Sequence, residues 1–97
     1  MSDASPSSEQ RVQLLVLERI DVARNMARYY VLSVEPTLFD DAAVVREWGR
    51  LGRLGGRRID LHAKNSDARL ALDAWLARKI RRGYVLRGAG TQPTSAE

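Results

Sequence analysis

Runs of apolar residues divide the chain into strand-like segments. Four of them are rich in β-branched and aromatic residues, and they lie at residues 12–20, 28–35, 43–52 and 57–63. The first, VQLLVLERI, has a mixed periodicity that also suits a helix, whereas the second, RYYVLSVE, stops at Pro36. A shorter apolar run, YVLR, follows at 84–87. The pattern therefore predicts five strands, with a helical alternative open for the first.

The third and fourth strands are expected to form a hairpin, because Gly55-Gly56 between them is typical of a two-residue turn. A type I′ turn needs positive φ at both central residues, which glycine adopts without steric cost. Along 57–63 apolar and polar residues alternate, so we expect one face of this strand to be buried and the other to be wet. The expected buried residues are Ile59, Leu61 and Ala63, and the expected wet residues are Arg58, Asp60 and His62.

One helix is predicted between Ser66 and Gly83. Ser66 is a good N-cap, Asp67 complements the helix dipole in the first turn, and Gly83 suits the position just past the C-terminus. Trp75 is expected to anchor the core. Lys79 is expected to bury its stem, while its ammonium group either reaches solvent or finds a partner. The apolar side chains share one broad helical face, made of Ala68, Ala71, Leu72, Trp75, Leu76 and Ile80.

These elements predict an α+β fold, in which one helix packs on one face of an antiparallel sheet of about five strands. The uncovered face of such a sheet must be polar or serve as a binding surface. We expect the folded domain to span residues 11–87. The segments 1–10 and 88–97 are expected to be disordered tails, because Ser, Thr, Gly, Pro and Ala dominate them.

Charge indicates the class of partner. The chain has 97 residues, 44% of them hydrophobic, which is enough for one small domain with a core. Residues 1–45 hold four basic and seven acidic residues, whereas residues 46–97 hold twelve basic and five acidic ones. A basic half is typical of a polyanion binder. Since the chain has no long apolar run and no signal peptide, we expect a cytoplasmic protein without membrane contact.

The segment REWGRLGRLGGRR, residues 46–58, concentrates five arginines, four glycines and a tryptophan. If it begins as a strand, Arg46, Trp48 and Arg50 share one face. Such a face suits a binding platform, on which the indole stacks on a sugar or base while the guanidinium groups hold phosphates. The alternative, equally compatible with the pattern, is that Trp48 turns inward at a bulge and fills the edge of the core. Gly49 and Gly52 suit a bulge or the close approach of another backbone segment.

The tripeptide WGR at 48–50, continued by a glycine-rich turn, resembles the signature of the WGR domain family. This domain occurs in poly(ADP-ribose) polymerases and in small bacterial proteins. LERID at 17–21, RYYVLSV at 28–34 and the close ARKIRRGYVL resemble further blocks of the family, in the same order. The resemblance implies an antiparallel sheet with one helix. It also implies that Trp48 stacks on the sugar of a DNA strand end. Arg50 is implied either to contact phosphate or to couple DNA contact to another domain, which here would be a separate protein if such coupling exists.

We therefore expect a stand-alone WGR module that binds nucleic acid, DNA in preference to RNA, at strand ends or along the backbone. The expected contact residues are Arg46, Trp48, Gly49, Arg50, Arg53, Arg57 and Arg58. The alternative is a protein docking module that uses the same face, since arginine and tryptophan also dominate interface hot spots. No catalysis, metal or cofactor is expected, because His62 is the only histidine and cysteine is absent.

Overall fold

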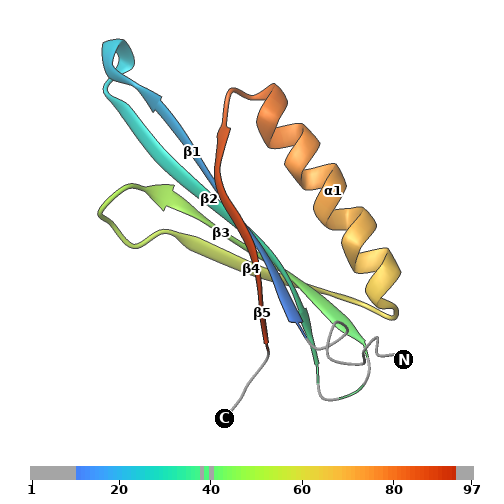
Figure 1. Ribbon diagram of the computed structural model, residues 1–97. Helices are drawn as coiled ribbons and strands as arrows, with labels where there is room; N and C mark the ends of the chain where they lie inside the picture. Colours follow the sequence, from blue (N-terminus) through green and yellow to red (C-terminus); the bar gives the residue numbers. More distant parts are fainter. Residues whose placement is uncertain (1–10, 38, 40, 94–97) are drawn as a thin grey trace.

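Five antiparallel strands form one sheet, and a single helix packs across one of its faces (Figure 1). The computed structural model describes residues 11–37, 39 and 41–93. In chain order the elements are β1 (Arg11–Asp21), the 3-10 turn η2 (Val22–Arg24), β2 (Met26–Pro36), β3 (Ala42–Arg50), β4 (Gly56–His62), α1 (Asn65–Arg81) and β5 (Val85–Pro93). The strands lie in the order β4-β3-β2-β1-β5, so β4 and β5 form the two edges. The predicted α+β fold is confirmed.

The two ends of the sheet differ from the prediction. The first segment forms a strand along its whole length, so its helical alternative is excluded. β5 continues to Pro93 and pairs with β1, so the sheet includes residues 88–93 that we expected in a tail. Composition does not reveal this strand, because its pairing with β1 uses backbone groups that every residue has. The predicted tails at 1–10 and 94–97 lie outside the described residues.

α1 begins two residues earlier than predicted. The carbonyl of Lys64 accepts the first helical hydrogen bond, from the amide of Ala68, so Lys64 is the N-cap and Ser66 lies within the first turn. Gly83 follows the helix with a φ of 97°, which confirms its predicted place past the C-terminus. Ile80, predicted on the buried face, is 46% exposed because it lies on the flank of the helix. Within the described residues no helix is long and apolar enough to cross a membrane.

The core lies between α1 and the three central strands. Its most deeply buried side chains are Leu17 from β1, Leu32 from β2, Val44 from β3 and Leu72 from α1. The register brings Leu17 opposite Tyr30 and Val34 opposite Val44, so every second residue of each central strand faces the helix. Trp48, Trp75 and Tyr84 pack against this cluster and are partly buried, which confirms Trp75 as part of the core.

The predicted faces of β4 are reversed. Ile59 is 50% exposed and Leu61 is 66% exposed, and Ala63 after the strand is exposed as well. Of the three polar residues predicted to be wet, Arg58 is exposed as predicted, whereas Asp60 and His62 are partly buried; all three share the side of the sheet that carries α1. The reason is the register of this edge strand, which sets Asp60 opposite Val44 and Ile59 opposite Val45.

A five-residue loop, 51–55, joins β3 to β4, so the predicted two-residue turn at Gly55-Gly56 is wrong. Positive φ occurs in this loop at Gly52 instead. Gly55 and Gly56 serve another purpose, because they lie against Trp48. A Cβ on Gly55 would collide with the carbonyl group of Trp48, and a Cβ on Gly56 would lie 2.5 Å from Cζ2 of the indole. The two glycines therefore make room for the tryptophan.

Candidate functional site

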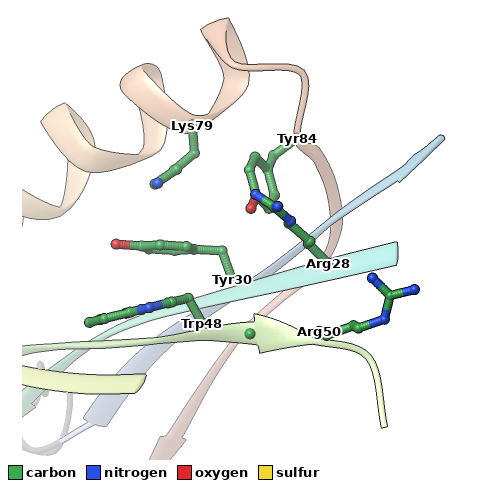
Figure 2. Close-up of a pocket in the computed structure, with 7 residues that line it drawn as sticks. Arg28, Tyr30, Trp48, Arg50, Lys79 and Tyr84 are labelled. Atoms are coloured by element: carbon green, nitrogen blue, oxygen red, sulfur yellow. The ribbon is translucent and has the colours of Figure 1, made fainter. Parts of the chain in front are cut away.

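A groove lined by aromatic rings and cations opens between the end of α1 and strands β2 and β3 (Figure 2). Its first hollow, about 280 Å³, is lined by Arg28, Tyr30, Trp48, Gly49, Arg50, Lys79 and Tyr84. A second hollow, about 260 Å³, shares Tyr30, Trp48 and Lys79 and adds Arg46 and Trp75. We call these two hollows together the aromatic groove.

The pairing of β2 with β3 brings the lining residues of the sheet together. Tyr30 lies opposite Trp48, and Arg28 lies opposite Arg50. Since paired residues in antiparallel strands point to the same side, all four stand on the side of the sheet that carries α1. Lys79 reaches toward Tyr30 from the last turn of the helix (Figure 2). Strand register thus brings together residues of β2 and β3, and the packing of α1 on the sheet adds Lys79.

The aromatic rings of the groove form a connected set. The rings of Tyr30 and Trp48 stack with centroids 6.0 Å apart and planes 17° from parallel. Tyr84 meets Tyr30 edge-on, with centroids 6.0 Å apart and an interplanar angle of 74°. Trp48 is partly buried against the core, yet it lines both hollows. It therefore combines features of both interpretations of the signature: the indole faces inward, as in the core alternative but without a bulge, and part of it lines the groove.

Arg46 lines the second hollow, but its side chain is largely buried. Its side chain is only 12% exposed, and its guanidinium carbon lies 4.0 Å from the ring centroid of Trp75 and 5.7 Å from that of Trp48. One terminal nitrogen donates a hydrogen bond to the hydroxyl of Tyr30 at 3.2 Å, and the other lies 3.5 Å from a carboxylate oxygen of Asp60. Its buried Nε has no hydrogen-bond partner in the described part of the chain.

Lys79 lies among cations and rings. Its ammonium nitrogen is 4.2 Å from the ring centroid of Tyr30 and 5.6 Å from that of Tyr84, which confirms that it finds a partner. Burial lowers the pKa of Lys79, and the neighbouring charges of Arg82, Arg46 and Arg78 lower this pKa further. The described residues that line the groove include no carboxylate. Its positive charge is therefore uncompensated within the lining.

The predicted contact residues separate into three positions. Arg46, Trp48, Gly49 and Arg50 line the aromatic groove. Arg53 is exposed in the loop that follows β3. Arg57 lies on the opposite face of the sheet, where its Nε is 3.0 Å from Glu47, and Arg58 lies at the edge, 3.3 Å from Asp60. The structure therefore does not bring Arg57 and Arg58 into the groove.

Arg50 is held at the mouth of the groove by the preceding hairpin. Its Nη2 donates to the backbone carbonyl of Asn25 at 3.2 Å, and the amide of Leu51 donates to the carbonyl of Ala27 at 2.9 Å. Asn25 has a φ of 52° at the end of η2, which directs the chain back into β2. The two hairpin loops at this end of the sheet are thus tied together, and Arg50 keeps its side chain beside the groove.

Sequence reasoning missed five lining residues as members of this site: Arg28, Tyr30, Trp75, Lys79 and Tyr84. Arg28 and Tyr30 share a face of β2 by parity, which the sequence does show. Their approach to Trp48 depends on the register between two strands, which parity alone does not give. Lys79 was recognisable as a cation on the buried helix face, but its neighbours across the sheet were not.

Fold and site together define a small α+β module whose distinguishing feature is a cationic, aromatic groove. Across the described residues, no group of three or more His, Asp or Glu side chains could hold a metal ion. The WGR domain model matches residues 13–91, so the chain belongs to the WGR domain family.

A curated protein with a longer chain is similar to this one in sequence. The uncharacterized protein y4dW of Sinorhizobium fredii is 45% identical over 85 residues, which cover 87% of this chain and 41% of the relative. The chain therefore spans about two-fifths of the length of that relative. No solved structure matches the chain.

Proposed function

We propose that this WGR domain binds nucleic acid, DNA in preference to RNA, through the aromatic groove. The observation that carries the proposal is the lining itself, which combines four aromatic rings with cations and includes no carboxylate among the described residues. A polyanion with flat or apolar units fits such a lining, and nucleic acid has both features. Membership of the WGR family supports the same conclusion.

The roles of the lining residues follow from their positions. Arg28 and Arg50 stand side by side at the mouth, where their guanidinium groups hold adjacent phosphates. The accessible part of Trp48, with Tyr84, receives a sugar or base by stacking. Lys79 adds a third cation at the helix side of the groove. Arg46 does not contact phosphate in this proposal, because Tyr30, Asp60 and two indoles already surround it.

Salt-dependent titration tests the proposal. Fluorescence anisotropy would follow labelled duplexes with blunt or overhanging ends, a closed circular duplex and a matched RNA between about 50 and 200 mM salt. Three phosphate contacts, from Arg28, Arg50 and Lys79, give a slope of log K against log salt of about −3. The blunt and overhanging duplexes bind better than the circle if strand ends are recognised, and equally if the backbone suffices.

Two matched variants localise the contact. Arg28→Gln should make the slope shallower by about one unit, because one phosphate contact is lost. Arg69→Gln, a control on the exposed surface of α1 outside the groove, should leave slope and affinity unchanged. Equal effects of both variants contradict a groove contact. Absence of binding to every duplex at about 50 mM salt contradicts the proposed nucleic-acid binding. This result would favour docking of an acidic protein at the same groove.

A further inference from the structure

β4 forms one edge of the sheet, and its outer side has no strand partner among the residues that the structure describes. Edge strands usually carry features that prevent pairing with another chain. β4 carries charged residues of this kind, but it also exposes two large apolar residues on the face away from α1, Ile59 at 50% and Leu61 at 66%. All seven residues from Gly56 to His62 are in strand conformation, with no bulge in their pairing with β3. This edge is therefore regular enough to accept another strand.

The sequence of β4 is self-complementary about its central residue. In an antiparallel pair with full overlap of 56–62, Ile59 meets Ile59 of the second copy on the two-fold axis. Arg58 then lies opposite Asp60 of the second copy, and Asp60 opposite its Arg58, so two opposite-charge pairs flank the axis. On the other face, the stem of Arg57 lies beside Leu61 of the second copy. One register thus satisfies length, charge and apolar contact.

Neighbouring registers fail on charge. Facing residues must lie on the same side of the sheet. The two-fold axis therefore passes midway between a residue and the same residue of the second copy. An axis through Arg58 sets two arginines opposite each other, and an axis through Asp60 sets two aspartates opposite each other. Like charges directly opposite destabilise a strand pair. The other edge, β5, offers no comparable pattern, since Gly88 and Gly90 flank its central Ala89.

We propose that the protein forms a two-fold symmetric dimer in which the β4 strands of two copies pair antiparallel about Ile59. The dimer has a continuous ten-stranded sheet, because each copy contributes five strands. A two-fold axis perpendicular to the sheet keeps both helices, and both aromatic grooves, on one side. The inference rests on the outer edge of β4 and is independent of whether the grooves bind nucleic acid.

Cysteine cross-linking tests this register directly, since the chain has no cysteine. In Ile59→Cys the two Cα atoms lie about 4.5–5.5 Å apart across the axis, which is within the range of a disulfide. Leu61→Cys is the matched control, because it lies on the same face but its two copies are separated by four residues, roughly 13 Å. Under mild oxidation, Ile59→Cys should give about ten times more disulfide-linked dimer than Leu61→Cys. Equal yields from the two variants would overturn the proposed register.

Sedimentation equilibrium of the unmodified chain supplies the second measurement. We expect a monomer–dimer equilibrium at concentrations up to about 1 mM. Ile59→Lys should be monomeric throughout, because two ammonium groups meet on the axis, and should keep its melting temperature since position 59 is half exposed. A monomer at every concentration of the unmodified chain overturns the dimer. Loss of dimerisation in Ile59→Lys with unchanged DNA binding separates this proposal from the proposed function.

Discussion

Replacement of Gly56 by alanine tests whether glycine is needed to place Trp48. Gly56 lies opposite Trp48 in the pairing of β3 with β4, and the indole leans over it. A Cβ at position 56 would lie 2.5 Å from Cζ2, 2.6 Å from Cε2 and 2.9 Å from Nε1 of the indole. These distances are below van der Waals contact, so the ring must move. Its other neighbours, Tyr30 and the guanidinium of Arg46, leave it little freedom to do so.

The expected magnitude follows from this crowding. Overpacking a closely packed site costs about 1–3 kcal/mol of unfolding free energy. Because Gly56→Ala also disturbs the stacking of Trp48 on Tyr30, we expect it to cost about 2 kcal/mol. For a domain of this size, 2 kcal/mol lowers the melting temperature by roughly 8–16 °C. Gly88→Ala is the matched control, because a Cβ there meets no atom within 4 Å and φ is not positive. It should change stability by less than about 0.5 kcal/mol.

Urea unfolding followed by far-ultraviolet circular dichroism measures these free energies without relying on tryptophan emission. A double-mutant cycle with Trp48→Phe adds a direct test, because phenylalanine has no Cζ2 at the position closest to the added methyl group. Gly56→Ala should therefore cost less in the Trp48→Phe background, with a coupling of about 1 kcal/mol. Gly56→Ala could prove as stable as the unmodified chain, or could lose the same unfolding free energy in both backgrounds. Either result would show that contact with the indole does not require glycine at position 56.

Three further predictions concern the core, the cation cluster and the opposite face. Trp75→Ala should destabilise the domain by about 3 kcal/mol in urea unfolding, because it removes a ring packed on the core, whereas Leu70→Ala on the exposed face should have little effect; equal losses would contradict a core role for Trp75. Because the pKa of Lys79 is lowered below 10.5 in the folded state, the unfolded chain binds more protons, so the melting temperature should rise with pH through the window just below 10.5. Lys79→Met should flatten this rise. An unchanged rise would refute the lowered pKa of Lys79 as its cause. Arg57→Ala should change stability by no more than about 1 kcal/mol and leave the salt slope of DNA binding intact, since its pair with Glu47 is exposed on the face away from the groove; a shallower slope would place phosphate on that face.

Local pattern was sufficient for most of the fold. The strand run at 28–35 and the helix ending at Gly83 combine propensity with clear boundaries, so each was predicted to within a few residues. β4 shows where pattern is insufficient. Alternation revealed that its two faces differ, but apolar residues at an edge strand need not face the helix, and Ile59 and Leu61 do not. The segment 88–93 escaped prediction because its pairing with β1 uses backbone groups that every residue possesses.

The site was predicted in part for the same physical reason. Trp48 and Arg50 are neighbours in sequence, so their shared face followed from parity alone. Arg28 joins them only through the register of β2 with β3, and Lys79 only through the packing of α1 across the sheet. Arg57 was grouped with them by sequence proximity, yet the register of β4 sets it opposite Glu47 and therefore on the other face. Register and layer packing are properties of the assembled sheet, so a linear pattern cannot supply them.

Lys79 and the arginines around it, Arg46, Arg78 and Arg82, give dissolved salt two opposite effects if the groove binds nucleic acid as proposed. Burial lowers the pKa of Lys79, and repulsion from the charges of Arg82, Arg46 and Arg78 lowers it further. Added ions screen this repulsion and so favour the folded state, while the same ions compete with phosphate for the groove. The free domain is therefore most stable under the conditions in which it binds a polyanion least. A phosphate bound there would replace the diffuse ions with localised charge and would itself stabilise the groove.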